Sequence, residues 1–187
     1  MQSAVTFLFI VVKTLADLYL LTFLLRFIMQ WVRASYHNPL SQFVFKVTNP
    51  LVVPARRILP SVAGLDTPTL VVLVVLEIIS TLLLLLLLGV SLAVPQLLLY
   101  SLLRLISLAL WFYTGALLIY ALLSWFGGRG ANPMAALLGE IVEPLLRPLR
   151  RLLPPLGGFD ITPAIVIVLL YALRMALPFP ATVEFLR

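Results

Sequence analysis

Few residues in this sequence could carry out catalysis. The chain of 187 residues has no cysteine, a single histidine (His37) and seven Asp plus Glu residues. This composition excludes disulfides, cysteine metal sites and histidine-rich catalytic centres. The sequence also has no glycine-rich phosphate loop, no G-x-S-x-G motif and no H-E-x-x-H motif. We therefore predict no catalytic residue, no metal, no cofactor and no enzymatic activity, and we interpret His37 as a solvated residue rather than a ligand.

Two pairs of adjacent arginines are the strongest candidates for binding. Arg56 and Arg57 form the first pair, and Arg150 and Arg151 form the second in a similar proline-rich setting. A guanidinium can bind a phosphate or a carboxylate through two parallel hydrogen bonds. These arginines would therefore suit anionic lipid headgroups or an acidic protein partner. The alternative is that they only orient the chain in a membrane by the positive-inside rule.

Several ionisable residues lie inside apolar stretches. Each costs about 2.5–3.5 kcal/mol at the centre of an isolated membrane-spanning helix, so we expect it to have a partner. Depths counted along the expected helices predict two ion pairs, Arg26 with Glu77 and Asp17 with Arg174. Such pairs could fix the register of the helices, or they could serve as relay sites for protons or ions.

Two further cations complete this set. Lys13 precedes Asp17 by four residues, so the two can pair along one helix face. Arg104 lies near one end of its apolar stretch, and we expect its side chain to reach the headgroups.

The elements that must position these residues are apolar helices. Hydrophobic residues make up 63% of the chain and charged residues 11%, whereas soluble domains carry about 25% charged residues. A net charge of +6 then suggests contact with anionic lipid rather than nucleic acid. A spanning helix needs roughly 20 mostly apolar residues. Four stretches qualify or come close, at residues 4–32, 70–94, 97–126 and 161–177, with a tight turn at Pro95–Gln96.

An internal repeat relates the two loops, residues 33–69 and 127–160, at an offset of 94 positions. The match depends on Trp, Asn, Pro, Arg, Gly and Asp, so leucine-rich composition does not explain it. The chain is therefore expected to hold two copies of one span–loop–span unit, at residues 1–94 and 95–187. Matched residues include Trp31 and Trp125, Asn38 and Asn132, Pro54 and Pro148, Arg56 and Arg150, and Asp66 and Asp160.

Each loop opens with an amphipathic helix of about three turns. Asn caps it and Pro takes its first position. Apolar residues then recur at i, i+3, i+4 and i+7, which predicts a helix lying at the membrane interface and ending before Pro50 or Pro144. The apolar residues are Leu40, Phe43, Val44 and Val47 in the first copy and Met134, Leu137, Leu138 and Ile141 in the second.

The segments that follow, residues 50–60 and 144–154, are rich in proline and arginine. Proline has no backbone N–H, so these segments leave backbone carbonyl groups unpaired and cannot face lipid. Each segment therefore lies at the interface or is buried against protein as a re-entrant element. Asp66 and Asp160 then sit where they can cap the next span.

The pattern W-x6-N-P…P-x3-P-x-R-R-x-L-P…G-x-D, present twice, resembles the YggT family of bacterial inner-membrane proteins. The resemblance is fuller in the first copy, because residues 127–130 replace Arg33–Tyr36 and Ala131 replaces His37. It implies a small multi-pass protein of the bacterial inner (cytoplasmic) membrane. Relatives with one repeat have been linked to plastid b-type cytochrome assembly and to the division locus of Gram-positive bacteria, and proteobacterial members to osmotic tolerance.

Two functions from different classes remain. The first is an all-α membrane scaffold or assembly factor that presents basic cytoplasmic platforms to anionic lipid or to an unidentified membrane or cytoplasmic protein, with homo-oligomers left open. It would act in cell-envelope or osmotic-stress homeostasis. The alternative is an oligomeric channel or ion-homeostasis component that uses the charges within the spans.

Charge placement predicts the topology. The two loops hold most of the basic residues and the Pro95–Gln96 turn holds none, so both loops should be cytoplasmic and both termini periplasmic. Because each unit crosses twice, its copies share one orientation and are related by an axis along the membrane normal.

Overall fold

The chain is all-helical in the computed structural model, which describes residues 2–62, 64–125, 133–151 and 160–186. Those residues form six α-helices, one 3-10 helix and a single isolated bridge between Val62 and Leu65. The elements in chain order are α1 Gln2–Trp31, α2 Pro39–Ile58, α3 Thr67–Leu87, α4 Val94–Trp125, α5 Pro133–Arg150, α6 Thr162–Met175 and the 3-10 helix η1 Ala181–Leu186.

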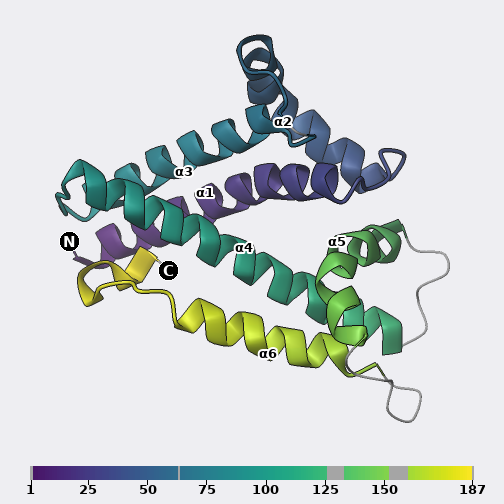
Figure 1. Ribbon diagram of the computed structural model, residues 1–187. Helices are drawn as coiled ribbons and strands as arrows, with labels where there is room; N and C mark the ends of the chain where they lie inside the picture. Colours follow the sequence, from purple (N-terminus) through teal and green to yellow (C-terminus); the bar gives the residue numbers. More distant parts are fainter. Residues whose placement is uncertain (1, 63, 126–132, 152–159, 187) are drawn as a thin grey trace.

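The helices α1, α3, α4 and α6 lie alongside one another, and the bent helices α2 and α5 cover one end of this bundle (Figure 1). α4 packs against α6, α3 and α1, while α1 packs along α3. α2 joins α1 and α3, and α5 joins α4 and α6, so the two sets make corresponding contacts. Both chain ends and the α3–α4 turn lie at the end opposite α2 and α5 (Figure 1). The arrangement thus places both loops at one end of the molecule.

Three of the predicted spans are long and apolar enough to cross a membrane. They correspond to Ala4–Trp31, Thr67–Leu87 and Val94–Ser124. α6, at the predicted fourth span, has 14 residues, which makes it about 21 Å long at about 1.5 Å per residue. It is therefore shorter than the predicted segment 161–177 and than a hydrocarbon core of about 30 Å.

The turn between the second and third spans comes earlier than predicted. α3 stops at Leu87, and Gly89 takes a φ of +68°. The N–H of Val90 donates to the carbonyl of Leu85 at 2.9 Å, which together with the Gly89–Leu86 bond makes a Schellman C-cap. Pro95, predicted in the turn, instead occupies the first turn of α4, where its missing N–H removes no helical bond.

The predicted ends of the two amphipathic helices are wrong. Asn38 does cap α2, since its side chain accepts the N–H of Leu40 at 2.9 Å. However, α2 runs through Pro50 and Pro54, and α5 runs through Pro144 and Pro148. All four prolines are exposed, and each pair is spaced i, i+4, so the lost backbone bonds fall on the outer face. The ribbons of α2 and α5 bend along their length (Figure 1) while their inner faces remain packed.

Those inner faces correct the predicted interfacial residues. Val44, Leu137, Leu138 and Ile141 are buried in the core, Leu40, Phe43 and Met134 are exposed, and Val47 is half-buried. The inner faces instead match at the 94-residue offset. Buried residues of α2 are Ser41, Val44, Thr48 and Val52, and their counterparts in α5 are Ala135, Leu138, Val142 and Leu146.

Candidate functional site

A buried ionic cluster joins three of the long helices. Arg104 of α4 is 3% exposed. Its Nη1 lies 3.1 Å from Oε1 of Glu77 on α3, and its Nη2 pairs with Oδ1 of Asp17 on α1. Nη1 also donates to the hydroxyls of Ser80 at 2.9 Å and Thr81 at 3.2 Å. One guanidinium thus pairs with two carboxylates and ties α1, α3 and α4 together.

This cluster corrects two predictions, the headgroup position of Arg104 and the Arg26–Glu77 pair. Arg104 lies ten residues after the start of α4, and Glu77 lies ten residues before the end of α3. Antiparallel helices joined by a short turn place residues at equal distances from that turn at one level, here about 15 Å along each helix. From the predicted turn at Pro95–Gln96 the two distances are unequal, so the match in level depends on where α3 ends and α4 begins in the structure.

Arg26 of α1 instead faces the bend in α2. Its Nη1 donates to Thr48 at 2.7 Å and to Asn49 at 2.9 Å, and its guanidinium carbon lies 4.8 Å from the centre of the Phe45 ring. Nε of Arg26 is 3.9 Å from the carboxylate of Asp66. Arg26 is 1% exposed, so it holds α2 on α1 from inside the protein.

A cavity of about 250 Å³, with a mostly apolar wall that also carries charged side chains, lies beside the cluster, between α1, α4, α6 and η1. Lys13 Nζ contacts Asp17 Oδ2 at 2.8 Å, which confirms the predicted i, i+4 pair. The predicted Asp17–Arg174 pair is replaced by other contacts: Asp17 binds Lys13 and Arg104, and Nε of Arg174 donates to Ser107 at 3.0 Å. Residues lining the cavity are Lys13, Thr14, Asp17, Leu18, Leu21, Arg104, Ser107, Leu108, Trp111, Arg174 and Leu186.

The same arginine–aspartate pair occurs once at each bent helix. Arg56 Nη2 lies 2.8 Å from Asp66 Oδ2, and Arg150 Nη2 lies 2.8 Å from Asp160 Oδ2. The members of each pair are ten residues apart, and the pairs themselves are 94 residues apart. Each ion pair joins the end of a bent helix to the start of the helix that follows it, α2 to α3 and α5 to α6. We call these two ion pairs the tethers.

The two tethers differ in burial. Asp66 has a fully buried side chain that also accepts the hydroxyl of Thr69 at 2.5 Å. It is the N-cap residue of α3, but its side chain makes no capping hydrogen bond, contrary to the prediction. The side chain of Asp160 is 30% exposed and accepts the N–H of Thr162 at 3.0 Å, but the N-cap residue of α6 is Ile161, one residue later than predicted.

Hydrogen bonds decide the ionisation of Asp160. Burial opposes its charge, but hydrogen bonds from Thr162 and Arg150, together with the charge of Arg150, hold the pKa of Asp160 below its ordinary value. Arg150 also donates to the hydroxyl of Tyr120 at 3.2 Å and pairs with Glu143 at 2.8 Å. Tyr120 stands where the first copy has Arg26, since the two positions are 94 residues apart.

The predicted binding arginines therefore divide into two kinds. Arg56 and Arg150 each pair with an aspartate in a tether, although the side chain of Arg56 is still 43% exposed, whereas Arg57 and Arg151 are exposed and belong to neither tether. The sequence signal for the tethers is the repeated R-x9-D spacing, whereas the position of Asp66 and Asp160 before a span predicts only caps.

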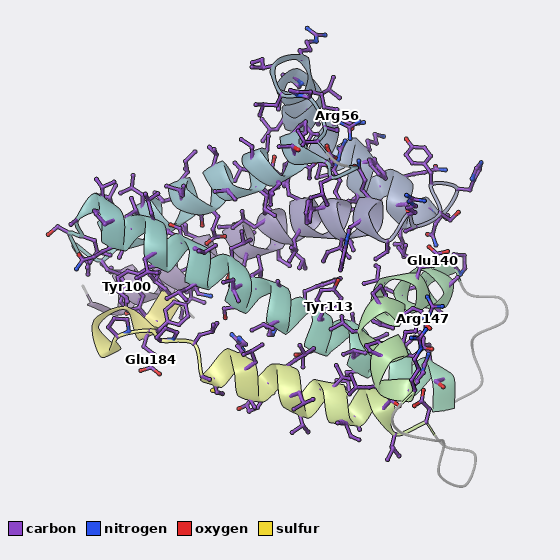
Figure 2. The ribbon with its side chains drawn as sticks, in the orientation of Figure 1. Arg56, Tyr100, Tyr113, Glu140, Arg147 and Glu184 are labelled. Atoms are coloured by element: carbon purple, nitrogen blue, oxygen red, sulfur yellow. The ribbon has the colours of Figure 1, made fainter. Side chains whose placement is uncertain are left out.

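The two loop regions also meet each other. The N–H of Ser35 donates to Glu140 at 3.0 Å, and the side-chain amide of Asn38 donates to the carbonyl of Pro133 at 2.6 Å. Figure 2 shows Glu140 and Arg147 on α5 at one end of the molecule, with Tyr100 and Glu184 at the other. α2 and α5 thus form one surface, which we call the basic platform. Its exposed cations include Lys46, Arg57, Arg147 and Arg151.

Comparison with known proteins identifies clear relatives. A family model described as CCB3/YggT matches two segments, residues 5–87 and 99–180. A protein of Pseudomonas aeruginosa is 42% identical over 167 residues, which cover 88% of this chain and 85% of that protein. The Escherichia coli K12 protein named YggT is 37% identical over 174 residues, covering 93% of this chain and 89% of its own length. Both are described as uncharacterized, and no solved structure matches.

Proposed function

The chain belongs to the CCB3/YggT family, and from this premise we propose that it is a membrane scaffold or assembly factor. Its basic platform would recruit anionic lipid or an acidic protein segment at the membrane surface. The resemblance to proteobacterial members with a link to osmotic tolerance makes cell-envelope or osmotic-stress homeostasis the proposed setting. The protein would act by binding, without a catalytic step.

The observation that carries this proposal is the repeated tether. In each copy Asp66 or Asp160 holds the first arginine of the pair, and the second arginine stays exposed. Because α2 and α5 are also packed on the bundle and joined to each other, their exposed cations are presented by a fixed backbone. Fixed presentation lowers the ordering cost of binding.

The proposed architecture is four spans in two tandem repeats of the same orientation. Similar packing of α1 with α3 and of α4 with α6 supports it, as do two family matches that begin 94 residues apart, at residues 5 and 99. In this arrangement the platform lies on the cytoplasmic side of the bacterial inner membrane and the termini are periplasmic. The shorter α6 would cross with the help of the chain that follows it.

The test is affinity capture in mild detergent with the Arg57→Gln/Arg151→Gln double variant. Because these side chains are exposed and unlike Arg56 and Arg150 hold no tether, the variant should insert and fold normally but lose most of its captured partner or anionic lipid. The matched control, Arg57→Lys/Arg151→Lys, keeps the charge but loses the two-pronged hydrogen bonding, and we expect it to bind with intermediate strength. Undiminished capture by the glutamine variant contradicts the proposal.

A transport function is the second candidate, because the Asp17–Arg104–Glu77 cluster lies beside a cavity between α1, α4 and α6 whose wall carries further charged side chains. A single four-helix chain has little room for a hydrated pore, so a transporter would be oligomeric. Ion flux in proteoliposomes, compared between the native chain and the Asp17→Asn and Glu77→Gln variants, tests it. If ion flux depends on these carboxylates and the Arg57→Gln/Arg151→Gln variant still captures its partner normally, transport replaces the scaffold as the proposed function.

A further inference from the structure

The cavity between α1, α4 and α6 has the wall chemistry of an anion site. Its wall carries the amino group of Lys13 and the guanidinium groups of Arg104 and Arg174. The carboxylate on the same wall belongs to Asp17, and both of its oxygens are already engaged, Oδ2 by Lys13 and Oδ1 by Arg104. On this wall Lys13 and Arg104 thus offer donors, while both oxygens of Asp17 are used.

A buried donor supports this interpretation. Nε of Arg104 is buried and has no hydrogen-bond partner among the described residues, although Nη1 and Nη2 of the same guanidinium both have partners. A buried N–H without a partner is costly, and an oxyanion in the cavity would satisfy it. Lys13 uses one of its three N–H groups on Asp17, so it also retains donors.

The rest of the cavity wall is apolar and reaches the outer surface of the bundle. Leu18 of α1 and Trp111 of α4 line it and are 53% and 52% exposed. In a membrane that outer surface faces lipid. The ligand class that fits both parts of the wall has an oxyanion at one end and tolerates apolar surroundings at the other.

The shortness of α6 lets such a group approach. α6 ends at Met175, one residue after Arg174, and its length of about 21 Å is less than a hydrocarbon core of about 30 Å. A bilayer thins beside a short span, which brings headgroups closer to the level of Arg174. Polar groups that would be buried in a full-thickness bilayer then become reachable.

We propose that this cavity binds a phosphate-class oxyanion, supplied either by the headgroup of an anionic phospholipid or by free phosphate. The site is separate from the basic platform, because it lies among α1, α4, α6 and η1 and shares no residue with α2 or α5. It therefore goes beyond the proposed scaffold function and can stand or fail independently of it.

The experiment compares two double variants with the same change in charge. Lys13→Gln/Arg174→Gln removes two cavity cations and leaves Arg104 paired with Asp17 and Glu77. Arg57→Gln/Arg151→Gln removes two exposed cations at the platform and is the matched control. In one arm, native mass spectrometry counts the phosphatidylglycerol molecules that each protein retains and compares them with retained diacylglycerol, which has no phosphate. In the other arm, inorganic phosphate is titrated in neutral detergent at constant ionic strength, and the thermal midpoint is followed.

We expect the cavity variant to bind about tenfold more weakly or worse, because each lost charge-assisted hydrogen bond is worth about 1.5–3 kcal/mol. The platform variant should keep the native affinity for inorganic phosphate. In the lipid arm it should lose only the lipid bound at the platform and still retain the lipid bound in the cavity. Loss in the lipid arm identifies a headgroup as the source, and loss in the phosphate arm identifies a free anion. Equal binding by the native chain and the cavity variant in both arms overturns the proposal, and loss in the platform variant alone assigns binding to the platform instead.

A second variant covers the case in which the cavity variant does not fold. Thr14 lines the cavity and is exposed, so Thr14→Phe narrows its mouth without removing a charge. It should weaken binding while the thermal midpoint without ligand stays unchanged. Unaltered binding by a folded Thr14→Phe protein overturns the proposal. The Lys13→Arg/Arg174→Lys variant keeps both positive charges of the cavity and should therefore bind the oxyanion, unlike Lys13→Gln/Arg174→Gln.

Discussion

At the residue scale, Arg104 is the side chain on which the bundle depends most. Replacing it with glutamine leaves the carboxylates of Glu77 and Asp17 without their shared cation, and Glu77 has a side chain only 2% exposed. Removing one partner of a buried ion pair costs about 3–5 kcal/mol. We predict that Arg104→Gln lowers the free energy of unfolding in detergent micelles by that amount. The exposed Arg57→Gln should change it by no more than about 0.5 kcal/mol, and equal effects of the two would show that the cluster is not stabilising.

Asp160 makes a prediction about pH. Its folded-state pKa is lowered, so its contribution to stability is complete above its unfolded pKa of about 3.9 and is lost as the pH falls through the lower folded value. The thermal midpoint of the native chain should therefore fall more steeply in acid than that of Asp160→Asn. The two curves should converge at the lowest pH, where both residues are neutral. Parallel curves over the whole acid range would show that the Arg150–Asp160 tether carries no charge-dependent stability.

At the element scale, the two tethers should not be equally strong. Asp66 has a fully buried side chain near two arginines and the Thr69 hydroxyl, whereas the side chain of Asp160 is 30% exposed. We predict that Asp66→Asn costs about 3 kcal/mol or more, and that Asp160→Asn near neutral pH costs about 1 kcal/mol or less.

Hydrogen exchange along α2 is the measurement for this prediction. The last turn of α2 should lose protection in Asp66→Asn, because that turn would no longer be fastened to α3. The Asp160→Asn variant serves as the control, since it should leave α2 unchanged and affect only the last turn of α5. Equal loss of stability in both variants would contradict the difference in burial.

The bent helices show how packing overrides a local rule. The residue before a proline is pushed out of the helical conformation, so the sequence predicts that the first amphipathic helix ends at Asn49–Pro50. In the structure Asn49 stays helical because it and Thr48 accept hydrogen bonds from Arg26, and because Val52 beyond the proline is buried in the core. These contacts come from α1 and from the whole core, which no local pattern of α2 contains.

At the scale of the whole molecule, the arrangement predicts which surfaces share one side of the membrane. The native chain has no cysteine, so single cysteines can be introduced at the exposed positions Val62, Arg147 and Ser91. Impermeant thiol reagents applied to intact spheroplasts should label Ser91→Cys and should reach Val62→Cys and Arg147→Cys only after lysis. Labelling of the last two from outside would reverse the proposed orientation, and opposite behaviour of Val62→Cys and Arg147→Cys would reject the same-orientation repeat.

The sequence by itself determined the helical class, the places of three long apolar helices and the 94-residue offset at which the two loops match. Each of these depends on composition or on periodicity along one segment, so it is present before the segments meet. The Lys13–Asp17 pair and the Asn38 cap were predictable for the same reason, because both partners lie within one turn of helix.

Only the tertiary structure decided which buried charges are partners. Glu77 pairs with Arg104 and not with Arg26, and the buried carboxylate of Asp66 pairs with Arg56. Such choices depend on the rotation and relative depth of helices that are far apart in sequence, and a shift of three residues in one helix start changes the depth by nearly one turn. A charge buried among helices takes whichever opposite charge the packing brings within reach, because leaving it unpaired in a low-dielectric interior costs more than any preference that its own segment encodes.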